Sequence, residues 1–122
     1  MIKNSKLNRT EKIWIGTMVS KKFDYKQELL DQVNSADILR EYTDYYISLK
    51  FNVSAQEKPI IIDAVTPIEM RVYRQNMAPV LFLLHLQQGF LVELEILNAD
   101  SSKLDKDLDI LSAKKEIIYD FI

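Results

Sequence analysis

The stretch VLFLLHLQQGFLVELEIL, residues 80–97, carries the strongest indication of the fold. Two apolar runs, 80–86 and 90–97, are separated by residues 87–89, which include Gln88 and Gly89. Glycine supplies the positive φ that a two-residue hairpin turn requires. The stretch therefore predicts a β-hairpin in which the numbers of opposed residues sum to 177, as 88 and 89 do.

Both faces of this hairpin would be apolar in that register. A sheet with one solvated face normally alternates between apolar and polar residues. We therefore expect the second face to be covered, either by the C-terminal segment or by a second chain. One face would carry Leu81, Leu83, His85, Val92, Leu94 and Ile96, and the other Phe82, Leu84, Leu86, Leu91, Glu93, Glu95 and Leu97.

Alternating apolar and polar residues predict further strands at 37–42, 45–53 and 68–73. The first two would form a hairpin with Thr43-Asp44 as its loop, which places Asp37 opposite Lys50. A short buried strand at 60–62 is a further option, although prolines flank it closely. The sheet would then have about five strands.

Two helices are predicted before the strands. Asn8 and Glu11 have the spacing of a capping box, and Asp24 and Gln27 repeat it. Apolar residues at helical spacing follow each pair. The predicted fold is α+β, with two N-terminal helices packed on an antiparallel meander and the C-terminal segment, a partial helix or a strand, packing back on the sheet.

Composition predicts one domain spanning residues 1–122. The chain is 48% hydrophobic and 28% charged, which is typical of a globular protein. Sixteen basic and eighteen acidic residues leave a charge of −2, so no overall field favours nucleic acid or membrane. The first residues form no signal peptide, and no apolar run is long enough to cross a membrane, so we expect a cytoplasmic protein.

Residue types with catalytic chemistry are few. The chain has no cysteine and a single histidine, which excludes thiolate and multi-histidine metal sites, and we expect no metal and no cofactor. His85 would face aliphatic side chains in the predicted register, so a structural role is favoured. Glu93 and Glu95 point the same way on a strand, and a solvated or partner-facing acidic pair is favoured over acid–base or metal chemistry. We expect no catalytic residue and no enzymatic activity.

Charge is distributed unevenly along the chain. Residues 1–26 carry seven Lys or Arg against two acids, whereas residues 90–122 carry four against eight. No nucleic-acid-binding motif accompanies the basic start, so nucleic acid is disfavoured as a partner. The acidic C-terminal part suits a basic protein partner.

The opening LNRTEK, residues 7–12, together with the LVELEI strand, residues 91–96, resembles a family of small, standalone bacterial proteins of uncharacterised function. In size, composition and architecture the chain is similar to immunity proteins of bacterial toxin systems, including contact-dependent growth inhibition. That resemblance implies a protein that binds and blocks a cognate toxin domain, often a nuclease.

In such a role, acidic side chains would pair with the basic substrate-binding residues of the toxin, and aromatic side chains would anchor the contact. An ordinary solvated sheet face is the alternative for each position, and a homodimeric interaction module or a small enzyme is the alternative for the protein. The predicted partner-binding residues are Asp37, Glu41, Asp44 and Tyr46 on the first hairpin, and Glu93 and Glu95 on the last.

Overall fold

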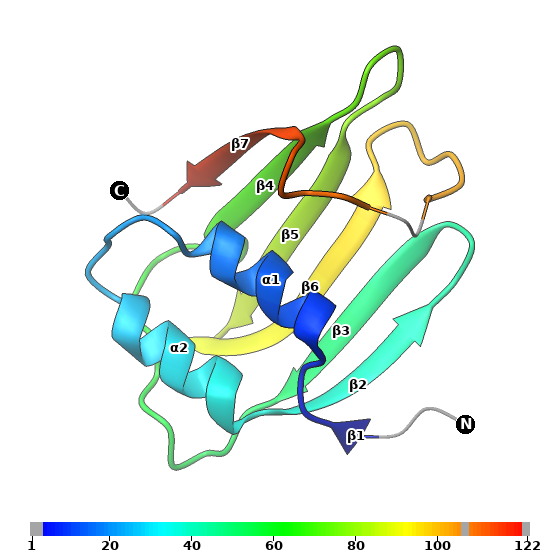
Figure 1. Cartoon of the computed structure of the whole chain (residues 1–122). Coiled ribbons are helices and arrows are strands. Elements are labelled where there is room, and N and C mark those ends of the chain that lie inside the picture. The colour runs from blue at the N-terminus through cyan, green and yellow to red at the C-terminus, as the bar shows by residue number, and fades with distance from the viewer. Residues whose placement is uncertain (1–3, 106–107, 121–122) are drawn as a thin grey trace.

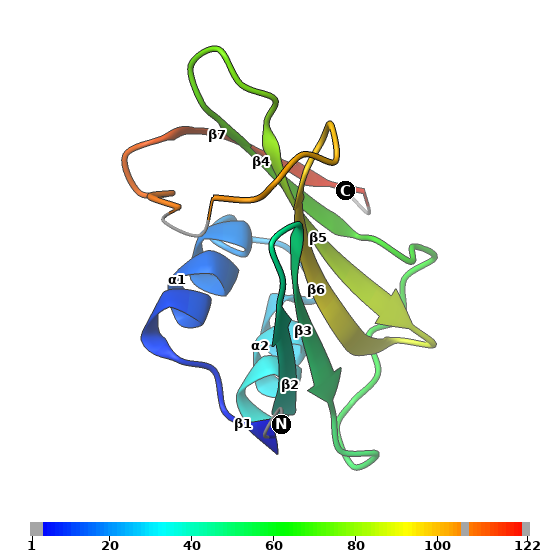
Figure 2. The same ribbon diagram turned by 90° about the vertical axis from the view of Figure 1, so that its right-hand side faces the viewer.

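The computed structural model describes residues 4–105 and 108–120. Two helices, α1 (Arg9–Met18) and α2 (Lys26–Ser35), lie on one face of a twisted antiparallel sheet (Figures 1 and 2). The α+β class is therefore confirmed, and the helices precede every strand except the two-residue β1 (Asn4–Ser5). The predicted meander was wrong, because the third strand along the chain pairs with the sixth and not with the fourth.

The sheet has seven strands in the order β1-β2-β3-β6-β5-β4-β7, and every pairing is antiparallel. Six of them have six residues or more, so the prediction of about five was too low. The C-terminal segment joins the edge of the sheet beside β4. The segment 60–62 forms no strand. The strands are β1 (Asn4–Ser5), β2 (Asp37–Tyr42), β3 (Tyr46–Asn52), β4 (Ile68–Tyr73), β5 (Val80–Gln87), β6 (Phe90–Asn98) and β7 (Lys114–Tyr119).

Only one of the two helices begins with the side-chain cap that the sequence predicts. At α1 the Asn8 side chain accepts a hydrogen bond from the Glu11 N–H, and the Glu11 side chain accepts one from the Asn8 N–H, both at 2.9 Å. This is the predicted capping box. The predicted cap at Asp24 is wrong, because α2 begins after Tyr25, without a side-chain cap.

The β5–β6 hairpin forms around the predicted turn but changes register after the first two residue pairs. Gln87 lies opposite Phe90, and that pair sums to 177. Beyond Leu86 a β-bulge shifts the pairing, so that His85 lies opposite Glu93 and all further pairs sum to 178. A shift of one residue exchanges the two faces of a strand. The predicted face assignment was therefore wrong beyond the bulge.

The corrected register separates apolar from acidic residues. Phe82 now lies beside Ile96, and Leu84 beside Leu94, and all four are fully buried. Glu95 moves to the opposite face with Leu83. One face of the hairpin is therefore buried and apolar, whereas the other carries leucines and acids together: Leu81, Leu83 and Leu97 share it with His85, Glu93 and Glu95, and all six are partly buried.

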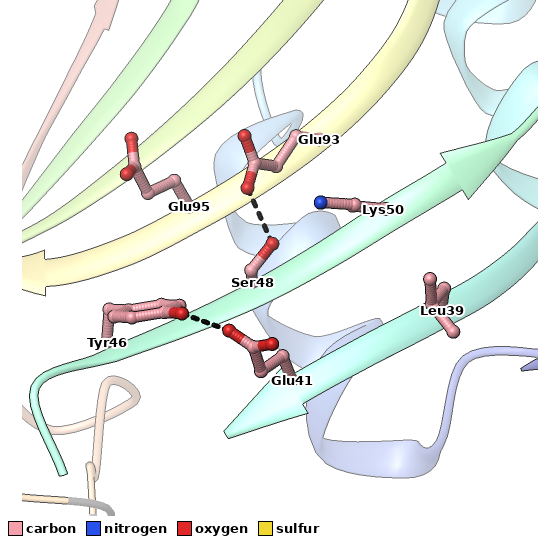
Figure 3. Close-up of a pocket in the computed structure, with 7 residues that line it drawn as sticks. All are labelled: Leu39, Glu41, Tyr46, Ser48, Lys50, Glu93 and Glu95. Atoms are coloured by element: carbon pink, nitrogen blue, oxygen red, sulfur yellow. Dashed lines mark hydrogen bonds between the residues drawn. The ribbon is translucent and has the colours of Figure 1, made fainter. Parts of the chain in front are cut away.

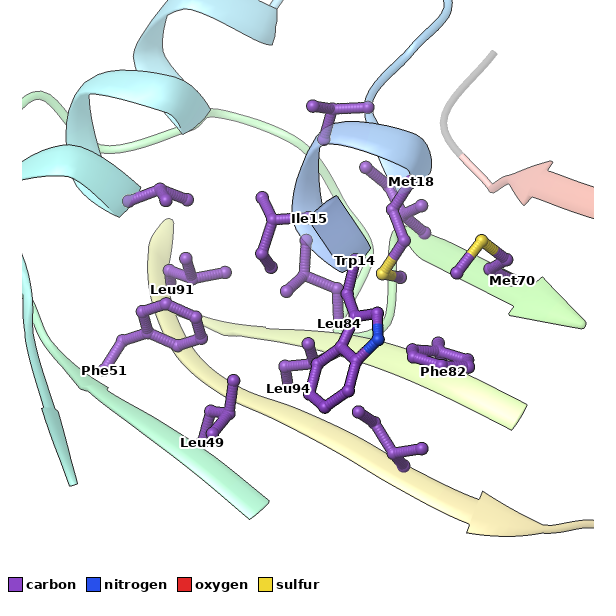
Figure 4. Close-up of a cluster of buried hydrophobic side chains, with 14 of the residues drawn as sticks. Trp14, Ile15, Met18, Leu49, Phe51, Met70, Phe82, Leu84, Leu91 and Leu94 are labelled. Carbon is purple, nitrogen blue, oxygen red and sulfur yellow. The ribbon is translucent and has the colours of Figure 1, made fainter. Parts of the chain in front are cut away.

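The core lies between that face and the helices (Figure 4). The Trp14 ring meets the Phe82 ring edge-on, at 5.8 Å between centroids and 67° between planes. Met18 is fully buried on the same helix. Leu104 and Ile110 from the C-terminal part are also buried in this core.

One buried glutamine connects α2 to the hairpin turn. The Gln32 side-chain amide donates to the Lys58 and Gly89 carbonyls at 2.8 and 3.0 Å, and its oxygen accepts from the Leu91 N–H at 2.9 Å. Gly89 has φ +84°, and a Cβ there would lie 2.8 Å from the Ile60 carbonyl oxygen. The turn therefore requires glycine both for its backbone angle and for the close approach of the loop.

We expect Gly89→Ala to lower the free energy of unfolding by about 1–3 kcal/mol or more, because alanine would be strained at positive φ and would displace the neighbouring loop. Gly16→Ala in α1 is the matched control. A Cβ at Gly16 meets nothing within 4 Å, and we expect that change to stabilise the helix by about 0.5–1 kcal/mol. Urea unfolding of both variants measures the difference, and shifts of the same sign would contradict the assignment.

Candidate binding site on the open sheet face

The sheet face opposite α1 and α2 carries the candidate site. In the part of the chain that the structure describes, both helices lie on the other face, and the C-terminal segment continues the sheet edge (Figure 2). The prediction that the C-terminal segment covers this second face was wrong. The strands β2, β3 and β6 are neighbours here, although β6 lies far from them in sequence.

A groove of about 180 Å³ crosses these three strands (Figure 3). Strand pairing sets its geometry: Glu41, Ser48 and Glu95 lie side by side in one row across the sheet, and Leu39, Lys50 and Glu93 lie side by side in the next. The lining residues are Leu39, Glu41, Tyr46, Ser48, Lys50, Glu93 and Glu95.

Hydroxyl groups orient two of the carboxylates. The Tyr46 hydroxyl donates to Glu41, and this hydrogen bond raises the pKa of Tyr46 above its ordinary value, so the phenol keeps its proton. The Ser48 hydroxyl donates to Glu93 at 2.5 Å (Figure 3). Ser48 is buried beneath these longer side chains. Neutral hydroxyl donors thus hold both carboxylates without themselves adding a positive charge.

The groove is negatively charged, since three carboxylates, Glu41, Glu93 and Glu95, face one ammonium group, that of Lys50. The apolar side chains of Leu39 and Tyr46 are 39% and 36% exposed at its border. Acidic groups beside exposed apolar groups provide both charge complementarity and contact area for a cationic ligand.

The single histidine adjoins this groove rather than an aliphatic cluster. His85 Nε2 lies 3.3 Å from a carboxylate oxygen of Glu95, and Nδ1 lies 2.8 Å from the Thr66 hydroxyl. The expectation that His85 faces aliphatic side chains was wrong, because the bulge places it opposite Glu93.

The series of hydroxyl, imidazole and carboxylate has the order of a catalytic triad. Thr66 is followed by Pro67, which has no N–H. A nucleophile elbow uses the N–H of the residue after the nucleophile to stabilise the oxyanion. That donor is missing here, so the arrangement lacks one part of a nucleophile elbow.

Four of the six predicted binding residues meet in the groove: Glu41, Tyr46, Glu93 and Glu95. Asp37 and Asp44 lie outside it. Asp37 forms an exposed ion pair with Lys6 at 3.4 Å, and Asp44 lies at the tip of the first hairpin.

The turn of the first hairpin explains both positions. Thr43 pairs with Tyr46 through its backbone and its hydroxyl, so the two turn residues are Asp44 and Tyr45 rather than Thr43 and Asp44. Asp37 consequently lies opposite Asn52, not Lys50. The register differs from the predicted one by two residues, which leaves each side chain on its predicted face.

Sequence reasoning missed Leu39, Ser48 and Lys50 as groove residues. Ser48 and Lys50 alternate with buried residues along β3, and this alternation was the available signal. Their position against Glu93 and Glu95 depends on the β3–β6 pairing, for which the sequence has no local signal.

No cluster of three or more His, Asp or Glu side chains suited to a metal ion occurs among the described residues. Within the same residues, neither helix has the length and apolar character needed to cross a membrane.

Comparison with models of known protein families, with curated protein sequences and with solved structures found no match.

Proposed function

We propose that this protein is a binding protein of the immunity type, which neutralises a toxin domain by covering its active site with the open sheet face. The observation that carries the proposal is the groove, in which Glu41, Glu93 and Glu95 outnumber Lys50. Such a surface attracts a partner of opposite charge and disfavours an acidic one.

The geometry favours a protein partner over a small molecule. The groove is shallow: its volume of about 180 Å³ lies below the roughly 300–1,000 Å³ of ordinary small-molecule pockets. It corresponds to about six water molecules at roughly 30 Å³ each, enough for a long side chain. Leu39 and Tyr46 add apolar contact area next to the charges, as at protein interfaces.

The mechanism follows from the charge of the groove. A toxin that cleaves nucleic acid holds the phosphates of its substrate with Lys and Arg side chains. The carboxylates of Glu93 and Glu95 would occupy the same cationic groups, while the surrounding sheet face excludes the substrate. Inhibition in this scheme requires no catalysis by the immunity protein.

Growth of cells that express a candidate toxin domain, chosen from neighbouring genes for large secreted proteins, tests the proposal. We expect the wild-type protein to restore growth, and the Glu93→Gln/Glu95→Gln variant to restore it less. Asp31→Asn/Glu57→Gln is the control with the same change in charge, since Asp31 lies on α2 and Glu57 in the loop before β4. Absence of rescue by the wild-type protein would contradict the proposed function.

A further inference from the structure

The two edges of the sheet differ. β1 contributes only two residues among those the structure describes, whereas β7 runs for six beside β4 (Figure 1). An edge strand carries backbone N–H and C=O groups that can pair with another strand. β7 contains neither proline nor glycine, and two adjacent isoleucines, Ile117 and Ile118, lie in it.

The hydrogen-bond pattern determines which residues of β7 point outward. The Asp120 N–H donates to the Pro67 carbonyl at 2.8 Å, in the register that places Ile68 opposite Tyr119. Hydrogen-bonded and non-hydrogen-bonded pairs alternate along an antiparallel ladder. The backbone groups of even-numbered residues of β7 therefore point toward β4, and those of Lys115 and Ile117 point to the outer edge.

We propose that β7 is a homodimerisation edge, at which a second copy of this chain adds its own β7 antiparallel across a two-fold axis. Symmetry and hydrogen bonding restrict the register of the two strands. A residue whose backbone groups point to the outer edge must lie opposite such a residue in the second copy. The two-fold axis must then pass midway between one residue of β7 and the same residue of the second copy, which lie directly opposite each other. Residues 115, 116, 117 and 118 are the possible centres.

Charge selects one of these four registers. A centre at Lys115 or at Glu116 places two like charges directly opposite each other, which is destabilising. A centre at Ile118 places Glu116 opposite the partner's Asp120, with the same effect. A centre at Ile117 creates no like-charge pair.

The register centred on Ile117 also creates attractive contacts. Lys114 lies opposite the partner's Asp120, and symmetry produces this pair twice. Both side chains are exposed in the single chain. The two Ile117 side chains meet on the helix side of the sheet, where each already packs against the core. Lysine at a sheet edge usually prevents pairing, whereas here Lys114 has a matching acid in the second copy.

Sedimentation velocity tests the dimer. A strand-to-strand contact of this length is small, so we expect a weak dimer that forms as concentration rises from about 10 µM to about 1 mM. Lys114→Glu and Asp120→Lys should each raise the dissociation constant about tenfold or more, because each places like charges opposite each other. Lys12→Glu on α1 is the control, and its dissociation constant should not change.

Mixing the two variants provides the decisive measurement. A Lys114→Glu chain and an Asp120→Lys chain together restore both opposite-charge pairs, so an equimolar mixture should dimerise like the wild type. Thermal melts of the three variants show whether each is folded. A wild-type protein that stays monomeric over the whole range would overturn the proposal, as would variants that dimerise normally alone or a mixture that does not recover.

The glutamine variant of the groove separates this proposal from the proposed function. Glu93→Gln/Glu95→Gln changes β6, which is two strands away from β4 and three strands away from β7 in the sheet. Its dissociation constant for the dimer should equal that of the wild type. A loss of dimerisation in that variant would instead place the contact on the open face and overturn the β7 register.

Discussion

Under the proposed function, Glu93→Gln/Glu95→Gln is expected to weaken toxin binding by about 2–5 kcal/mol, with most of the loss in faster dissociation. Glu93 is partly buried in the groove, and its carboxylate is held by the buried Ser48 hydroxyl at 2.5 Å. A toxin cation paired with this carboxylate would lose its counter-charge in a desolvated contact. Surface plasmon resonance with the toxin domain measures both rate constants.

Salt should affect mainly the association rate. The Debye length falls from about 30 Å at 0.01 M salt to about 8 Å at 0.15 M, which screens the acidic face from an approaching basic partner. Asp31→Asn/Glu57→Gln is the control, and a thermal melt checks that folding is unchanged. Salt-insensitive binding, together with unchanged rate constants in the glutamine variant, would exclude the acidic groove as the contact.

The elements predicted correctly depend on residues close together in sequence. The capping box of α1 joins residues three apart, and the Gln88-Gly89 turn joins neighbours. The error at Thr43 was also local, but it moved the register by two and left Glu41 and Tyr46 on the same face. Alternation along β2 and β3 therefore predicted the shared face of Glu41 and Tyr46, whereas their place beside Glu93 and Glu95 depends on the β3–β6 pairing.

The errors that mattered came from contacts between distant segments. Val92 is the extra residue of the β6 bulge, and nothing in its apolar surroundings distinguishes it from a paired strand residue. A shift of a single residue reversed the face of Glu93 and Glu95 relative to β5. Likewise, the place of β7 beside β4 depends on long-range pairing, for which the C-terminal sequence has no local signal.

Glu11 combines its role in the capping box with an ion pair to Arg40, in which the glutamate is buried and the arginine is partly buried. Its side chain is fully buried, and Arg40 donates to both carboxylate oxygens at 2.8 and 2.9 Å. The Tyr42 hydroxyl donates to the same carboxylate at 3.0 Å. This network connects the first turn of α1 to β2. Removal of one partner from a buried pair leaves the other charge uncompensated.

We therefore expect Glu11→Ala to lower the free energy of unfolding by about 3–5 kcal/mol at neutral pH. Asp37→Asn removes the exposed pair with Lys6, and it should change the free energy by at most about 1 kcal/mol. Urea unfolding at neutral pH measures both. Equal effects of the two substitutions would show that burial adds nothing to the Glu11–Arg40 pair.

Acid should remove the contribution of Glu11 from the wild-type protein. Burial by itself raises the pKa of this carboxyl, but hydrogen bonds from Arg40, the Asn8 N–H and Tyr42 outweigh it and lower the pKa below its ordinary 4.5. The unfolded state then binds the proton more readily, so the stabilisation is complete above pH 4.5 and is lost as pH falls through the folded-state pKa. Glu11→Gln has no proton to take up at this position. Its free energy of unfolding should decline less steeply than that of the wild type below pH 4.5, and parallel declines of the two proteins in an acid titration would show that Glu11 is not the group responsible.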